Sequence, residues 1–221
     1  MDGFQFGVLQ QAFPLLMEGL TVTVGLSAAS FILALAVGIA VGVLRSESPL
    51  FKALLSPYVE MFRGTPLLIQ LFFIYYGLPS LGITFSNITA GILGLGLNGG
   101  AYISEIIRGA LLAIPPEQSE AAVASGLSRL QALRFVVLPQ AIRVATPPLV
   151  NAFSATLKES SLVSVLAITE LTRVSQLVYT RTFRAFEVYL TVGILYFLLI
   201  HTVSRLSRRL EQQKNLPPAA R

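Results

Sequence analysis

Two long stretches without a single charged side chain limit what this chain can fold into. Residues 19–44 and 64–104 contain no Asp, Glu, Lys or Arg. Because a bilayer core about 30 Å thick takes roughly 20 apolar residues per helix, the first stretch predicts one membrane span and the second predicts two. We expect the second stretch to break near Gly77, Pro79 and Gly82, where turn-forming residues cluster.

Two further apolar segments bring the expected number of spans to five. The fourth covers about residues 135–157 and is interrupted by Arg143 and by the kink-prone pair Pro147-Pro148. The fifth covers about residues 189–203. Only 12% of the residues are charged, whereas soluble domains carry about 25%. The sequence therefore predicts an all-α polytopic membrane protein with five transmembrane helices.

The basic residues predict how these spans are oriented. No Lys or Arg precedes Arg45, which together with the length of the apolar run argues against a cleaved signal peptide. Basic residues then follow spans one, three and five, and they are Arg45, Lys52, Arg129, Arg134, Arg205, Arg208, Arg209, Lys214 and Arg221. With five spans they share one face, which the positive-inside rule assigns to the cytoplasm, so the N-terminus is external. This topology places Arg173, Arg181 and Arg184 outside, on a loop expected to pack as a short helix.

We expect one transmembrane domain rather than two folded units. It covers residues 19–208, with an external segment at residues 1–18 and a cytoplasmic tail at residues 209–221 that is loosely ordered from residue 212. The net charge of +5 is explained by topology and by anionic lipid headgroups, so no nucleic-acid partner is expected. The chain has no Cys, which excludes disulfides and thiolate metal sites.

A polar loop at residues 115–136, between spans three and four, predicts two short helices back to back. The Pro-Pro pair that opens it suits a first helical turn, where no backbone N–H is missed. Gly126 supplies a left-handed end to the first helix. Ser128 and Gln131 have the spacing of a capping box that starts the second helix. A small knob of this kind on one membrane face has the shape of a docking element for another protein.

Common nucleotide-binding patterns are absent or misplaced. The spacing Gly94-x-Gly96-x-x-Gly99 matches a dinucleotide fingerprint, but inside an uncharged membrane stretch such small residues instead let helices pack closely. No Lys directly follows Gly, so there is no P-loop. The single His201 and the single Asp2 argue against catalytic triads and metal clusters. We therefore expect no enzymatic activity and no cofactor in this chain; if ATP drives it, another subunit must bind the nucleotide.

Charged residues at membrane depth are costly, so they usually face a cavity or a partner. The candidates are Arg63, Glu105, Arg108, Arg143, Lys158 and Glu159. Glu105 and Arg108 stand three residues apart on one helix and are expected to pair. The run from Lys158 to Ser161 offers an ammonium, a carboxylate and two hydroxyls, which suit a zwitterionic ligand. The alternative is a solvated helix end that is capped by Ser.

An interruption of regular helix is expected at Gly64-Thr65-Pro66, because Pro lacks an N–H and Gly relaxes the backbone. Exposed backbone groups at this depth are tolerated where they are buried in protein or line a wet cavity. Gln70, one to two turns later, and Asn98 on span three add uncharged hydrogen-bonding groups.

Several of these motifs resemble the permeases of ATP-binding-cassette importers that take up polar amino acids. Glu120-Ala121-Ala122, with Gly126 and Leu138-Pro139 behind it, looks like the EAA loop of those permeases, although Val136 stands where Ile is more usual. Glu117 also departs from the subfamily, which more often has Gly there. The other matching motifs are Phe62-Arg63-Gly64-Thr65-Pro66-Leu67-Leu68-Ile69-Gln70, Tyr75-Tyr76-Gly77-Leu78-Pro79, Ala101-Tyr102-x2-Glu105-x2-Arg108-Gly109 and Lys158-Glu159-Ser160-Ser161-Leu162.

The resemblance implies a type I ABC importer permease fold in a bacterial inner membrane. It implies a translocation path lined by Thr65, Gln70, Asn98, Glu105, Lys158, Glu159, Ser160 and Ser161. It also implies contact with an ATPase through Glu120, Ala121, Ala122, Gly126 and Leu130. The expected partners are a cytoplasmic ATP-binding subunit that holds ATP and Mg²⁺, a second permease that is identical or closely related, an external solute-binding protein, and the lipid bilayer.

Other functions remain open at this stage. Another small polar solute is an alternative cargo, and the sequence does not specify which amino acid the chain would carry. A secondary transporter or channel would work without an ATPase. An exporter-type half transporter would normally be longer and carry a fused ATPase, and a purely structural anchor would not require the polar knob.

Overall fold

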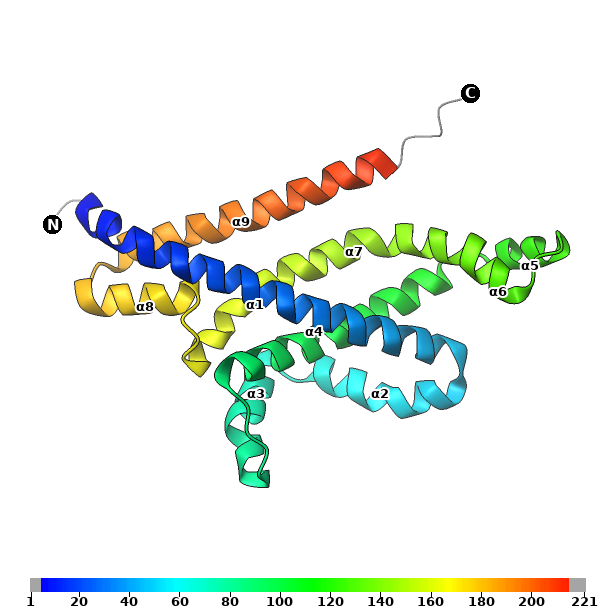
Figure 1. Ribbon diagram of the computed structural model, residues 1–221, viewed down its shortest axis with the longest axis horizontal. Helices are drawn as coiled ribbons and strands as arrows, with labels where there is room; N and C mark the ends of the chain where they lie inside the picture. Colours follow the sequence, from blue (N-terminus) through cyan, green and yellow to red (C-terminus); the bar gives the residue numbers. More distant parts are fainter. Residues whose placement is uncertain (1–4, 215–221) are drawn as a thin grey trace.

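The computed structural model describes residues 5–214, and within them every regular element is a helix (Figure 1). The α-helices are α1 (Phe6–Glu47), α2 (Pro49–Gly64), α3 (Leu67–Phe72), α4 (Asn87–Leu112), α5 (Pro116–Ala124), α6 (Arg129–Ala132), α7 (Leu138–Glu159), α8 (Leu171–Thr182) and α9 (Ala185–Lys214). Shorter segments connect them: π-helical turns at Phe73–Gly77 and Leu133–Val137, and 3-10 helices at Leu78–Leu81 and Ser160–Leu166. The predicted all-α class is confirmed.

Within residues 5–214, three helices are long and apolar enough to cross a membrane alone, namely α1, α4 and α9. Two bent pairs meet the same test together. In one, α2 and the segment Leu67–Leu81 meet at 108°; in the other, Arg129–Leu166 and α8 meet at 52°. The expected five spans are reached when each bent pair counts as one span.

The first helix begins earlier than expected. α1 starts at Phe6 and runs for 42 residues, which at 1.5 Å per residue is about 63 Å and well beyond the thickness of a bilayer core. Residues 6–18, expected to form a separate external segment, therefore continue the first span as one helix. Residues 1–4 of that segment and residues 215–221 of the expected loose tail lie outside the described residues, whereas residues 212–214 of that tail belong to α9.

The break predicted after α2 is present. Thr65 is extended (φ −121°, ψ 147°), and α3 starts directly after Pro66. The next break also falls where turn formers cluster, because the 3-10 helix Leu78–Leu81 ends at Gly82, which has φ +82°. This left-handed conformation favours glycine.

The expected interruption of the fourth span does not occur. α7 is assigned as one helix from Leu138 to Glu159, with Pro147 and Pro148 inside it. Proline is tolerated within membrane helices because neighbouring groups satisfy the carbonyls it leaves free. Arg143 lies on this helix as an exposed side chain.

Close contact between α1 and α4 confirms that the glycines of span three serve helix packing. A Cβ added to Gly96 would stand 2.6 Å from Leu33 Cδ2, and one added to Gly99 would stand 3.0 Å from Ala34 Cβ. On the other side of the contact, a Cβ on Gly42 would stand 2.7 Å from the carbonyl oxygen of Ser104. Larger residues would force the two helices apart.

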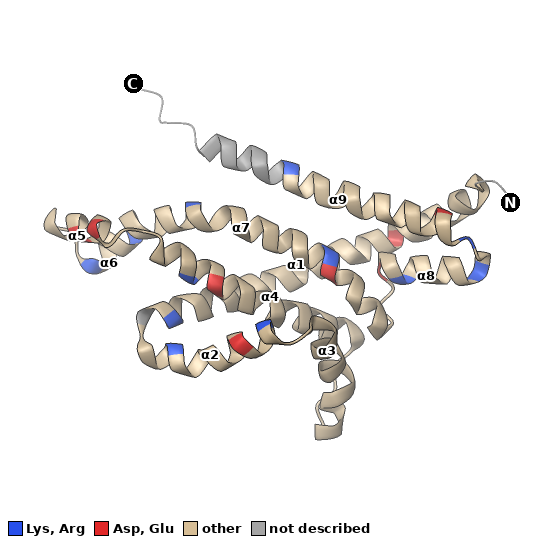
Figure 2. Ribbon diagram, turned by 180° about the vertical axis from the view of Figure 1, so that it is seen from behind, with Lys and Arg blue, Asp and Glu red and all other residues tan. Residues whose placement is uncertain are grey.

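The two ends of the elongated molecule carry different short helices. α8 lies beside α1 and α9 at one end, while α5 and α6 project at the other (Figure 1). The buried carboxylate of Glu170 caps α8, accepting from the N–H groups of Thr172 (2.8 Å) and Arg173 (2.7 Å). The helix expected around Arg173 and Arg181 is therefore present. Figure 2 shows long uncharged stretches of α1, α7 and α9 between these ends.

Candidate functional site

The projecting loop has the predicted helix–Gly–helix form. α5 ends at Ala124, and Gly126, two residues later, has φ +91°. The N–H of Gly126 donates to Val123 O (2.9 Å) and the N–H of Leu127 donates to Ala122 O (3.2 Å). These two bonds form a Schellman motif, which satisfies carbonyls that the helix end would otherwise leave free.

The second helix of the loop starts with the predicted capping box. Ser128 Oγ accepts from the N–H of Gln131 (3.3 Å), and the N–H of Ser128 donates to Gln131 Oε1 (2.8 Å). α6 then continues through the π-helical turn at Leu133–Val137 into α7 without a loop. The knob is therefore joined directly to a membrane span.

The residues expected to contact an ATPase lie on this knob. Glu120, Ala121 and Gly126 are exposed, and Leu130 is 73% exposed. Ala122 is the exception, because its side chain is buried. The knob thus presents both polar and apolar side chains that the rest of the chain does not cover.

A cavity of about 370 Å³ lies between α4 and α7. Its polar lining residues are Asn98, Tyr102, Asn151, Thr156 and Glu159. Two of them, Asn98 and Glu159, belong to the set expected to line a translocation path. The cavity brings these two residues together, although they are 61 positions apart in the sequence.

Three of the expected path residues meet at the break between α2 and α3. Gln70 Nε2 donates to Phe62 O (2.9 Å), to Thr65 O (3.0 Å) and to Thr65 Oγ1 (2.8 Å). Asn98 Nδ2 donates to Phe62 O (3.1 Å) and to Gln70 Oε1 (3.0 Å). In a continuous helix, the N–H of residue 66 would donate to Phe62 O. Because Pro66 has no N–H, the side-chain amides of Gln70 and Asn98 donate to this carbonyl instead.

The cluster that follows α7 is divided between two environments. Glu159 is partly buried and lines the cavity, whereas Lys158 is exposed and does not. Ser160 Oγ donates to Leu157 O (2.9 Å) and Ser161 Oγ donates to Lys158 O (2.7 Å). The two hydroxyls therefore cap the helix end, as the alternative interpretation of this cluster expects, and the carboxylate faces the cavity.

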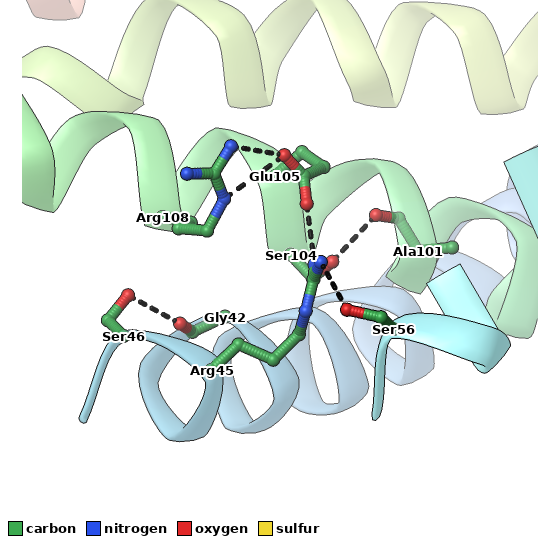
Figure 3. A network of polar contacts seen from close by, with 8 residues as sticks. All are labelled: Gly42, Arg45, Ser46, Ser56, Ala101, Ser104, Glu105 and Arg108. Atoms are coloured by element: carbon green, nitrogen blue, oxygen red, sulfur yellow. Dashed lines mark hydrogen bonds and ion pairs between the residues drawn. The ribbon is translucent and has the colours of Figure 1, made fainter. Parts of the chain in front are cut away.

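Glu105 lies outside the cavity lining, in a polar network between three helices (Figure 3). Its carboxylate binds Arg108 Nη2 at 2.7 Å, the predicted local pair, and also Arg45 Nη1 at 2.5 Å. Arg45 Nη2 donates to Ser56 Oγ at 3.2 Å. The side chain of Arg45 is only 8% exposed, so this network ties the end of α1 to α2 and α4.

Comparison of the sequence with known proteins supports the features described above. Residues 34–215 match the family described as the inner membrane component of binding-protein-dependent transport systems. The chain belongs to this family. Members are multi-pass membrane proteins, in agreement with the long apolar helices of the fold.

Two relatives within the family cover nearly the whole chain. The glutamine transport system permease protein of Escherichia coli (strain K12) is 36% identical over 220 residues, covering 96% of this chain and 99% of its own length. The L-cystine transport system permease protein of Bacillus subtilis (strain 168) is 34% identical over 209 residues, covering 93% and 89%.

Solved structures support the same assignment. A chain of an amino acid ABC transporter crystallised with histidines superposes with a TM-score of 0.90 at 36% identity, covering 96% of this chain and 100% of that one. A chain of the inward-facing MetNI methionine ABC transporter has a TM-score of 0.76 at 23% identity, which supports the fold alone. The expected fold of an ABC importer permease is thereby confirmed.

Sequence reasoning missed three polar residues of the cavity in this family member, namely Tyr102, Asn151 and Thr156. Asn151 is an amide inside the fourth span, and the test that selected Asn98 would have found it. Tyr102 lines the cavity beside Arg63, whose guanidinium carbon lies 5.4 Å from the centre of the Tyr102 ring. No sequence rule connects these two residues, because only the packing of α2 on α4 brings them together.

Proposed function

We propose that this chain is the permease subunit of an ATP-driven importer of a polar amino acid. The observation that carries the proposal is the nearly full-length similarity to a glutamine permease and to a solved amino acid ABC transporter, both at 36% identity. We thus assign to this chain the class of substrate that appears in the names of those two proteins.

The chemistry of the cavity between α4 and α7 supports an amino acid substrate. Glu159 supplies a carboxylate that suits an ammonium group, and no ion pair within the described side chains includes it. Asn98 and Asn151 supply amides that suit a carboxylate or a polar side chain. We assign the path to this cavity and to the adjoining break at Thr65 and Gln70.

The remaining expected path residues take supporting roles in this proposal. Glu105 holds three helices together, and Ser160 and Ser161 close the end of α7. Lys158 is exposed next to Glu159. In this proposal, substrate contacts Lys158 before it enters the cavity.

The proposed partners follow from what the chain lacks and what it exposes. It has no P-loop lysine, so we assign ATP and Mg²⁺ to a separate cytoplasmic subunit that grips the knob at residues 115–136. A second permease, identical or related, completes the path, and an external solute-binding protein delivers the substrate. The distribution of basic residues supports an external N-terminus and a cytoplasmic knob.

The test is uptake by proteoliposomes that contain this chain, its ATPase and its binding protein, measured with a panel of labelled amino acids. We expect uptake of one polar amino acid or a small group of them, which requires ATP inside and stops with vanadate. Uptake by this chain alone, insensitive to vanadate, would instead establish a secondary transporter. Calorimetry of the binding protein against the same panel identifies the substrate independently.

A further inference from the structure

A second hollow of about 350 Å³ lies between α1, α4 and α7, towards the end of the molecule that carries α5 and α6. Every residue that lines it is Ala, Val, Ile or Leu. Three of the lining residues are the alanines 110, 141 and 145, whose small side chains leave the space open. We call this hollow the apolar groove.

The apolar groove is separate from the cavity assigned to the substrate. On α4 the groove uses residues 107–111, whereas the substrate cavity uses residues 98–106. On α7 the groove uses residues 138–149, and the cavity begins only at Pro148. The groove also has α1 as a third wall, through Ile39 and Val43, which the substrate cavity lacks.

A cation without a carboxylate partner among the described side chains lies about one helical turn before the groove residue Leu138. Arg134 precedes the groove residue Leu138 by four positions, about one helical turn, so the two lie on the same side of the chain. The guanidinium of Arg134 lies 5.7 Å from the centre of the exposed Phe135 ring, and it forms no ion pair with any side chain that the structure describes.

We propose that the apolar groove holds an acyl chain of an anionic phospholipid, whose phosphate binds Arg134. A guanidinium binds phosphate through paired, charge-assisted hydrogen bonds, and basic residues at a membrane surface attract anionic lipids. The apolar wall accepts the acyl chain because it offers no group that needs water. Ile142, which is 58% exposed, forms the outer lip of the groove.

Native mass spectrometry of the purified, detergent-solubilised assembly tests this site, after exchange with equal amounts of phosphatidylglycerol and phosphatidylcholine. The wild-type chain should retain one molecule of phosphatidylglycerol in preference to phosphatidylcholine. Arg134→Gln should reduce that preference about tenfold, as expected for one lost charge-assisted contact. Arg143→Gln, which removes an exposed cation from the same region of the chain but not from the groove, should leave the preference unchanged.

A second pair of variants tests the acyl-chain part of the site. Ala145→Phe fills the groove and should abolish lipid retention, whereas Val144→Phe places the same phenyl ring on an exposed neighbour and should not. Equal retention by these two variants, or an equal loss for Arg134→Gln and Arg143→Gln, overturns the proposal. Disulfide cross-linking between two copies through Ile142→Cys, in this otherwise Cys-free chain, would show that a second copy covers the groove, and this also overturns it.

Discussion

Asn98 donates a hydrogen bond of 3.0 Å to the side-chain oxygen of Gln70, which joins α4 to the start of α3 beside a 108° bend. Gln70 in turn donates to the main-chain oxygen of Phe62, the acceptor that Pro66 leaves without a helical donor. Two amide side chains therefore hold the bend that borders the proposed substrate cavity.

Gln70→Leu tests the importance of this bend for stability. The substitution keeps the size of the side chain but leaves Asn98 and the Phe62 carbonyl with fewer partners, so we expect a loss of about 1–3 kcal/mol. The measurement is the thermal unfolding midpoint in detergent. Gln118→Leu, on the exposed surface of α5, is the control and should have little effect. Equal midpoints for the two variants would show that the amide network is dispensable.

Glu105→Gln tests the network in Figure 3. Because Arg45 is 8% exposed, removing its carboxylate partner leaves a buried charge uncompensated, and we expect a loss of about 3 kcal/mol. Arg108→Gln removes the partner that is 34% exposed, so its cost should stay below about 1 kcal/mol. Thermal unfolding of both variants, side by side, decides the matter; a larger loss for Arg108→Gln would contradict the assignment.

Gly42→Ala tests the contact between α1 and α4. The added methyl group would stand 2.7 Å from a main-chain oxygen, which cannot move cheaply, and we expect a loss of about 1–3 kcal/mol. Gly25→Ala makes the same change on the same helix with nothing within 4 Å. It should gain up to about 1 kcal/mol from helix propensity. The unfolding midpoints should therefore move in opposite directions, and a shared direction would refute the packing argument.

Gly126→Val tests the proposed coupling of the knob to an ATPase. Valine is β-branched and resists the φ of +91° found here, so the turn between α5 and α6 should distort. We expect uncoupling, measured as fewer substrate molecules imported per ATP hydrolysed. Gly126→Asn is the matched control, because Asn tolerates a left-handed backbone. Normal assembly with full transport by the Val variant would argue against this role.

Glu159→Gln tests the proposed substrate site. Loss of the carboxylate should weaken apparent substrate affinity in uptake assays by about tenfold or more, the cost of one charge-assisted hydrogen bond. Membrane insertion should be unaffected, as judged by the amount of assembled complex. Lys158→Gln, which alters an exposed neighbour outside the cavity lining, should have the smaller effect. Unchanged uptake kinetics for Glu159→Gln would remove this residue from the site.

Local signals in the sequence predicted local structure well. The stop at Gly126, the capping box at Ser128 and Gln131, and the break at Pro66 each depend on residues a few positions apart, and all are present. Charge-free runs likewise located α1 and α4, because a helix that crosses the bilayer core needs about 20 consecutive apolar residues.

Contacts distant in sequence could not be predicted in this way. Arg45 meets Glu105 across 60 positions, and only the packing of α1 on α4 brings them together. The early start of α1 has the same origin. Glu18 bounds the charge-free run on its N-terminal side. Ala12 and Leu16, which precede it, are nevertheless buried with Val174, Val178 and Val188 of α8 and α9. Tertiary burial therefore extends the helix beyond the membrane pattern.

The unbroken connection of α6 through the π-helical turn into α7 has a mechanical consequence. From Leu138 to Glu159 the chain rises about 1.5 Å per residue, so the carboxylate stands roughly 30 Å from the base of the knob along a single rod. A movement of the knob would reach Glu159 along α7 as a tilt or a translation of the helix. The helix would bend most easily midway, at Pro147 and Pro148. The length and stiffness of this one helix would thus set how far Glu159 moves for a given movement of the knob.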